Sequence, residues 1–153
     1  MPAGLTNLTQ LWDGLGLDLR WNALFQSDPA VVAFLNRKQL DGPDWRNAQT
    51  IAPHGLRAEA VGPEAVRLSW QPIRFSEGAG FYRVFRSTSP AGPFAAVVQT
   101  ANKRATGFTV TDLLPGVSHY FRVRTVTPPH ADNANQVVSL PGGVVRTSTP
   151  GGP

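Results

Sequence analysis

Short apolar runs separated by turn residues fill residues 52–149, and this spacing constrains the fold more than any other feature of the chain. The turn signals recur about every 8–12 residues, which is the pattern of an all-β sandwich. Glycine and proline mark many of the connections, as expected where the chain reverses direction. Seven strands are predicted, at residues 55–61, 65–70, 81–86, 94–99, 107–111, 119–127 and 144–149.

The chain contains no cysteine among its 153 residues. A disulfide framework, a thiolate metal site and a cysteine nucleophile are therefore excluded. Hydrophobic residues make up 41% of the chain, which is sufficient for a packed core. No apolar run reaches the roughly 18 residues that a membrane helix needs, so membrane insertion is not expected. Residues 1–10 lack the basic start and apolar stretch of a signal peptide.

Charge and periodicity both change near residue 52. Residues 1–52 carry four basic and five acidic side chains, whereas residues 53–153 carry ten basic and five acidic ones, a net charge of +5. The change indicates two parts, residues 1–51 and residues 52–150. The join between them is short, so we expect the two parts to pack together rather than to swing freely.

Leucine recurs closely in residues 1–51, and residues 17–24 read L-x-L-x-x-N-x-L. Leu17 and Leu19 are expected to alternate inward from a short strand, and the Asn22 side chain to bond backbone groups where the chain turns. This pattern resembles the centre of a leucine-rich repeat. Gly14 stands where a regular repeat has leucine, so the repeat is irregular or terminal.

A helix is predicted at about residues 28–38. Ser27 or Asp28 supplies the N-cap, and Pro29 suits the first turn. One face of this helix is apolar, formed by Val31, Phe34, Leu35 and the stem of Lys38. A strand, an asparagine turn and such a helix resemble the C-terminal cap of a leucine-rich-repeat array. One repeat cannot bury its own apolar face, so further repeats are expected in a longer polypeptide; a short standalone protein is the alternative.

Three stretches of the second part have distinctive patterns: residues 66–72 (VRLSWQP), residues 80–87 (GFYRVFRS) and residues 113–123 (LLPGVSHYFRV). In this order they resemble the second strand with its buried tryptophan, the third strand and the approach to the sixth strand of the fibronectin type III domain. The turn at residues 89–94 resembles one that is common in bacterial members. The resemblance implies a mainly β fold: a seven-stranded immunoglobulin-like sandwich at residues 52–150, with a small N-terminal leucine-rich-repeat and helix cap.

His119 departs from the family pattern, which places a tyrosine at this corner. Because Phe121 and Val123 are expected to face inward, His119 faces inward too. One ring nitrogen then replaces the hydrogen bond of the tyrosine hydroxyl. A pH switch and a catalytic role are the alternatives to this structural role.

Catalytic constellations are missing from the sequence. The three histidines, His54, His119 and His130, have no metal-binding spacing, and neither a nucleophile elbow nor a phosphate-binding loop occurs. We therefore expect no enzyme activity, no catalytic residue, no metal and no cofactor.

One sheet face and one loop are the candidate contact sites. The third and sixth strands are neighbours in this fold, so their outward residues form one face: Arg83, Phe85, Tyr120, Arg122 and Arg124. The loop at residues 127–136 offers His130, Asp132, Asn133 and Asn135. The face is suited to a protein or an acidic glycan surface; nucleic acid is not expected, because +5 is a modest charge. Alternatively, the arginine stems only cover the aromatic rings, or the face packs on residues 1–51.

The resemblance implies a non-catalytic interaction or spacer module of a bacterial extracellular or cell-surface protein. The alternative is an accessory module of a secreted multidomain hydrolase whose catalytic domain is absent from this chain.

Overall fold

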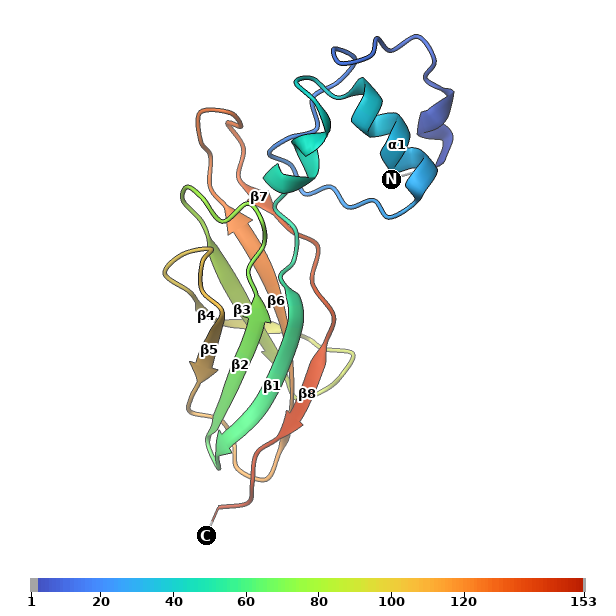
Figure 1. The fold of residues 1–153 in the computed structure, drawn as a ribbon. Helices are drawn as coiled ribbons and strands as arrows, with labels where there is room; N and C mark the ends of the chain where they lie inside the picture. Colours follow the sequence, from blue (N-terminus) through green and yellow to red (C-terminus); the bar gives the residue numbers. More distant parts are fainter. Residues whose placement is uncertain (1–2, 153) are drawn as a thin grey trace.

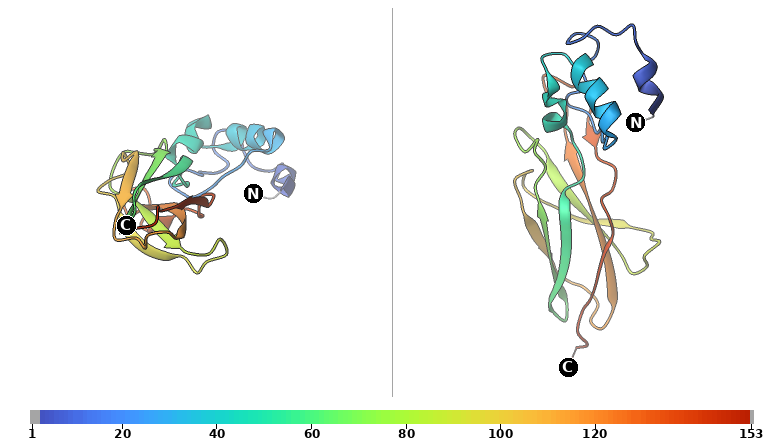
Figure 2. Two further views of the ribbon diagram at one scale, coloured as in Figure 1. Left: turned by 90° about the horizontal axis from the view of Figure 1, so that it is seen from below. Right: turned by 45° about the vertical axis from the view of Figure 1, so that its right-hand side comes forward.

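The computed structural model describes residues 3–152 and shows a small helical unit seated at one end of an elongated β-sandwich (Figure 1). We call residues 3–50 the N-terminal unit and residues 54–148 the sandwich. The chain leaves the sandwich at the opposite end, and the N-terminal unit projects to one side of it (Figure 2).

Two sheets form the sandwich, and all seven predicted strands are confirmed with small shifts at their ends. One sheet has the order β1-β2-β5; in the other, β4-β3-β6 continues to β7, and β8 also pairs with β6. The additional strand, β7, has only two residues, too few for a pattern in the sequence to indicate it. The strands are β1 (His54–Gly62), β2 (Ala65–Gln71), β3 (Phe81–Ser87), β4 (Ala95–Gln99), β5 (Gly107–Val110), β6 (Ser118–Thr127), β7 (Val137–Val138) and β8 (Val145–Ser148).

The core of the sandwich is built on aromatic residues from three strands. The rings of Trp70 and Tyr82 meet edge to face with centroids 5.4 Å apart, and Phe121 is fully buried beside them. The Tyr82 hydroxyl donates to the carbonyl oxygen of Lys103 at 2.7 Å and accepts from the Ile73 amide at 2.9 Å. This core therefore needs no disulfide, because large rings fill it and the one buried phenol is fully hydrogen-bonded.

His119 occupies the corner position that the sequence predicted. Its side chain is fully buried, and Nε2 lies 3.1 Å from the carbonyl oxygen of Leu114. Since that oxygen only accepts, Nε2 donates. Thr149 donates to the same oxygen at 2.7 Å, so the corner joins the start of β6 to the end of the chain.

The predicted helix is confirmed as α1 (Pro29–Lys38). The Asp28 carboxylate caps it by accepting from the amides of Ala30 and Val31. Val31, Phe34 and Leu35 are buried against Trp45, which lies on the 3₁₀ helix η2 (Pro43–Ala48). A second 3₁₀ helix, η1 (Ala3–Asn7), lies against α1. Leucines at positions 11, 17, 19 and 24 complete this second core.

The strand expected at Leu17 and Leu19 is not formed. Only Leu17 makes a bridge, to Gln39. Buried glutamine side chains take the place of a neighbouring strand: Gln39 accepts from the Leu19 amide at 2.9 Å, and Gln49 accepts from the Leu24 amide at 2.9 Å. The side-chain amide of Asn22 donates to the backbone carbonyls of Leu19 and Arg20, as the sequence predicted.

The two parts of the molecule are joined by direct contacts. The hydroxyls of Thr50 and Thr127 lie 2.8 Å apart in a buried position. The Asn133 side chain donates to the carbonyl oxygen of Trp21 at 2.8 Å. These contacts agree with the expectation that a short join packs the two parts together.

Candidate functional site

Strand register brings the five predicted sheet residues onto one outer face. Arg83 lies opposite Arg124, and Phe85 lies opposite Arg122, across the antiparallel β3–β6 pair. Their neighbours along both strands, such as Val84 and Val123, are buried. Because side chains alternate along a strand, the five residues therefore point away from the core.

A fourth arginine joins this face from β8. Arg146 pairs with Tyr120 in the β6–β8 ladder, and it is not among the residues predicted from the sequence. Alternation alone would have pointed it outward, but its placement beside β6 depends on a pairing between distant segments. We define the arginine face as Arg83, Arg122, Arg124 and Arg146 with the aromatic residues Phe85 and Tyr120.

The aromatic rings hold the arginine side chains against the sheet. The guanidinium carbon of Arg122 lies 4.2 Å from the ring centroid of Phe94 and 5.7 Å from that of Phe85. Arg124 also lies 5.7 Å from the Phe85 centroid. The Nε atoms of both arginines are buried without a hydrogen-bond partner. Stacking therefore limits the rotamers of the charged groups.

The arginines of this face form no ion pair with a described carboxylate. Their polar partners among the described residues are neutral: Gln99 lies 3.5 Å from Arg83 and Ser118 lies 3.0 Å from Arg146. The contacts with the N-terminal unit run elsewhere, through Thr127 and Asn133. The alternative that this face packs on residues 1–51 is therefore not realised, whereas the arginine side chains do lie against aromatic rings, as the other alternative held.

The candidate loop lies beyond the end of β6, beside the N-terminal unit. His130 and Asn133 exchange two backbone hydrogen bonds, of 2.9 and 3.1 Å. The Asn133 side chain is engaged with Trp21 and also receives the amide of Asn135, whereas Asp132 is exposed. The loop thus serves first as a contact between the two parts, and the structure does not bring it together with the arginine face.

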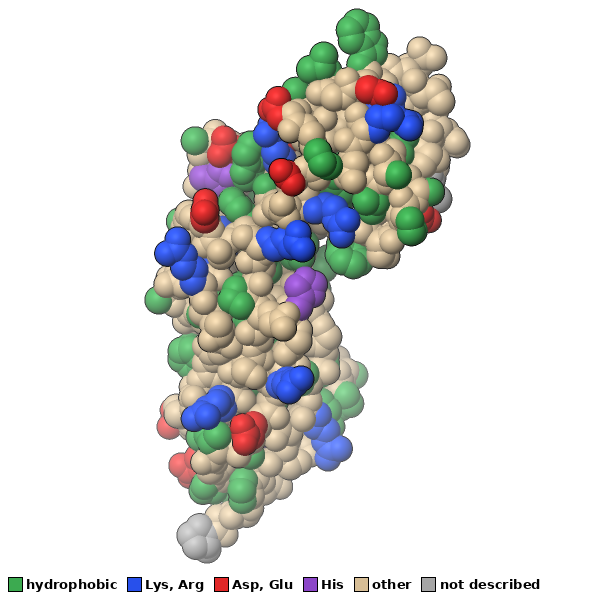
Figure 3. All heavy atoms as spheres, in the orientation of Figure 1, with side chains coloured by type: hydrophobic (Ala, Val, Ile, Leu, Met, Phe, Trp, Pro, Cys, Tyr) green, Lys and Arg blue, Asp and Glu red, His purple; other side chains and the backbone are tan. Residues whose placement is uncertain are grey.

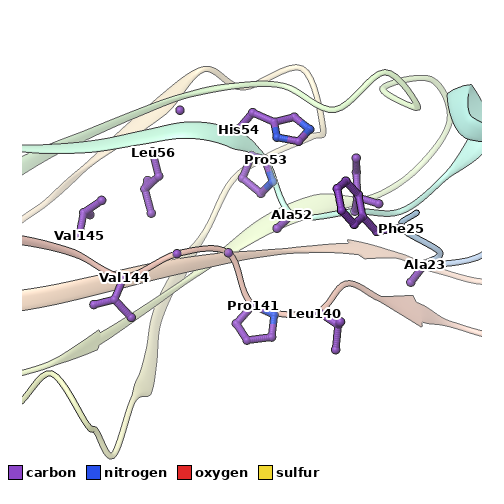
Figure 4. Close-up of a pocket in the computed structure, with 14 residues that line it drawn as sticks. Ala23, Phe25, Ala52, Pro53, His54, Leu56, Leu140, Pro141, Val144 and Val145 are labelled. Carbon is purple, nitrogen blue, oxygen red and sulfur yellow. The ribbon is translucent and has the colours of Figure 1, made fainter. Parts of the chain in front are cut away.

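An apolar cavity of 540 Å³ lies at the join on another side of the molecule. Figure 4 shows Ala23 and Phe25 of the N-terminal unit at one end of it and Val144 and Val145 at the other. Pro53 and Pro141 line its middle, and among the described residues of its lining only His54 has an ionisable side chain. One imidazole among apolar walls provides no partner for acid–base chemistry.

Lys103 is a buried cation that the sequence did not reveal. It is fully buried, and its Nζ has no hydrogen-bond partner. Nζ lies 3.7 Å from the ring centroid of Phe75. Burial lowers the pKa of Lys103 from 10.5 to about 8. The segment Asn102-Lys103-Arg104 reads as an exposed polar loop, so only the tertiary structure shows that this amine points inward.

The described residues include no group of three or more histidine, cysteine or acidic side chains that could hold a metal ion. Within residues 3–152, no helix is both long and apolar enough to cross a membrane.

Comparison with known proteins gives a family match and many similar solved structures, among them the following two. The model of the fibronectin type III domain matches residues 51–136. The third fibronectin III domain of the human KIAA0343 protein is 18% identical, with a TM-score of 0.47 over 68% of this chain and 87% of that one. A structure described as a myokine is 16% identical, with a TM-score of 0.48 over 67% of this chain and 99% of that one.

Proposed function

The chain belongs to the fibronectin type III family, and we propose that it acts as an interaction module whose arginine face binds an acidic partner surface. Domains of this family are typically non-catalytic interaction or spacer modules. To this general role we add a particular binding surface, the arginine face, and a partner of negative charge.

One observation carries the proposal: a rigid sheet fixes four arginines, and no described carboxylate pairs with any of them. Adjacent strands lie about 4.8 Å apart and alternate residues about 6.8 Å apart. The arginines are therefore spaced so that several can contact one polymer or one protein surface. Repulsion among like charges falls when an anionic partner is bound, which favours binding.

An acidic polysaccharide or an acidic protein surface is the proposed partner. Guanidinium groups form paired hydrogen bonds with carboxylates and comparable oxyanions. The modest net charge does not favour nucleic acid as the partner. We place this module in a bacterial extracellular or cell-surface protein, as the sequence resemblance implies.

We further propose that leucine-rich repeats precede the N-terminal unit. Its outer end carries the exposed side chains of Leu8, Trp12 and Leu15, and Trp12 is 75% exposed. Figure 3 shows hydrophobic side chains at this end of the molecule. A preceding repeat would cover such a surface, as stacked repeats do.

A charge-reversal series tests the proposed partner. The variant Arg83→Glu, Arg122→Glu, Arg124→Glu is compared with the wild type on an array of acidic and neutral glycans and a panel of acidic proteins. The matched control is Arg57→Glu, Arg67→Glu, Arg104→Glu, which changes the net charge equally at exposed positions outside the face. We expect binding to acidic surfaces that only the first variant loses; no binding by the wild type, or equal losses in both variants, would contradict the proposal.

A further inference from the structure

A second cavity, of 240 Å³, lies at the join and has aromatic walls. Trp21 reaches it from the N-terminal unit, Phe75 from the connection between β2 and β3, and His130 from the loop after β6. The ring centroids of Trp21 and His130 are 6.5 Å apart, and those of His130 and Phe75 are 6.1 Å apart. Three rings from separate segments thus surround one space.

Carboxylates accompany these rings. Glu77 and Asp132 line the cavity and are both exposed, and within the described part of the chain no lysine or arginine lines it. The space is several times the roughly 30 Å³ that a water molecule occupies. It is smaller than the roughly 300–1,000 Å³ of a pocket for a drug-sized ligand. The cavity therefore suits a compact group of several heavy atoms.

Two of these rings already have a cation over one face. The guanidinium carbon of Arg20 lies 4.6 Å from the Trp21 centroid, and the amine of Lys103 lies 3.7 Å from that of Phe75. Because Lys103 is fully buried, the face of Phe75 that it covers is turned to the interior. Neither cation stands in the lining of the cavity itself.

We infer that this cavity binds a small organic cation, of the quaternary or highly methylated ammonium class. Such a cation is attracted to the faces of aromatic rings and makes few hydrogen bonds, so apolar walls suit it. The two carboxylates complement its charge, and they disfavour an anionic ligand.

Trp21 is held in place before any ligand arrives. Its backbone lies in the left-handed region, at φ 57°, which few residues other than glycine adopt. Its amide donates to the Ala48 carbonyl at 3.0 Å, and its carbonyl accepts from Asn133 at 2.8 Å. A residue whose backbone is fixed in this way loses little backbone freedom on binding.

A ligand pair tests the inference on the full chain. Choline and its neutral isostere, 3,3-dimethyl-1-butanol, are titrated while the assigned Trp21 indole signal is followed by NMR. The two molecules have the same shape, so only the positive charge distinguishes them. We expect choline to bind at least about fivefold more tightly than the isostere. Equal affinities, or no shift with either ligand, would overturn the inference.

Matched variants locate the site. Phe75→Leu keeps the apolar wall and removes the ring, and we expect choline affinity to fall at least about fivefold. Glu77→Gln removes one rim charge at an exposed position, and we expect a fall of about two- to threefold. The controls are Phe25→Leu, an exposed ring outside this cavity, and Glu64→Gln, an exposed acid in the β1–β2 turn.

Thermal unfolding shows whether each variant is folded. If Phe75→Leu does not fold, the choline affinity of Glu77→Gln tests the site instead. Target variants that bind choline as well as the controls do would overturn the site. The charge reversal on the arginine face is expected to leave choline affinity unchanged. Failure of this inference is therefore distinguishable from failure of the proposed function.

Discussion

Lys103 brings an amine into the sandwich without giving it a hydrogen-bond partner. The adjacent ring of Phe75, at 3.7 Å, offsets part of the cost of removing the charge from water. The remaining cost lowers the pKa of Lys103 to about 8. At pH 7 the amine is charged in both the folded and the unfolded chain, so the folded state carries the full penalty.

The stability of the protein is expected to rise between pH 8 and 10.5, because the folded chain releases the Lys103 proton before the unfolded chain does. The free energy of unfolding should increase by about 2 kcal/mol from pH 7 to pH 9.5, at about 1.4 kcal/mol per pKa unit. Burial raises the pKa of Tyr82 above its usual value of 10. The folded chain therefore keeps this proton when the unfolded chain releases it, and this lowers stability only above about pH 10.

Lys103→Met isolates this effect, because methionine fills similar space without a charge. In urea unfolding at pH 7, the variant should be more stable than the wild type. Its stability should not rise from pH 7 to pH 9.5, whereas that of the wild type should. A variant that keeps the full gain would show that another group is responsible.

At the scale of elements, glutamine side chains perform in the N-terminal unit what strand pairing performs in the sandwich. Gln49 is 2% exposed and bonds three backbone groups. It accepts from the Leu24 amide and donates to the carbonyls of Leu19 and Trp45, at 2.9, 2.7 and 2.7 Å. The segment from Leu17 to Leu24 therefore stays ordered although it is not part of a sheet.

Gln49→Leu should destabilise the protein by about 2 kcal/mol or more, because it removes three hydrogen bonds from partly or fully buried backbone groups, of which the Leu19 carbonyl keeps its bond from the Asn22 side chain. Hydrogen exchange at the Leu24 amide should accelerate most. Gln136→Leu, at an exposed loop position, is the matched control. Equal stabilities of the two variants would show that the Gln49 hydrogen bonds contribute little.

The β2–β5 pairing depends on a close approach at Gly107, where a Cβ atom would lie 2.3 Å from the carbonyl oxygen of Leu68. Gly107→Ala should therefore cost about 1–3 kcal/mol of unfolding free energy. At Gly143 an added Cβ meets nothing within 4 Å, so Gly143→Ala should change stability little. Thermal or urea unfolding compares the two; similar values would contradict this account.

Strand positions were predictable because they depend on local alternation and turns, and so was α1, because its cap and apolar face lie within eleven residues. The inward position of the His119 side chain was predictable, because alternate residues of a strand share a face and Phe121 and Val123 point inward. The strand at Leu17 was predicted wrongly, since nothing local shows that Gln39 and Gln49 fold back onto it. Gly107 shows the same limit: its close approach to Leu68 is a contact between strands.

At the scale of the whole molecule, the candidate sites depend on contacts between segments far apart in the sequence. The residues of the arginine face on β3 and β6 were predictable, because it is enough to know that the two strands are neighbours and that side chains alternate along each of them. Arg146 required the pairing of β8. The cavity of Trp21, Phe75 and His130 required the packing of the N-terminal unit on the sandwich, which no local pattern specifies.

We expect the position of the arginines, rather than the total charge of the molecule, to direct binding to acidic surfaces. The direct measurement is the salt concentration that elutes each protein from a column carrying a sulfated polysaccharide. Wild type and the control Arg57→Glu, Arg67→Glu, Arg104→Glu should elute at similar, high salt. The variant Arg83→Glu, Arg122→Glu, Arg124→Glu should elute near the start of the gradient. It makes fewer contacts with the polysaccharide, so less salt is needed to screen the remaining attraction. Equal elution of the two variants would contradict the account.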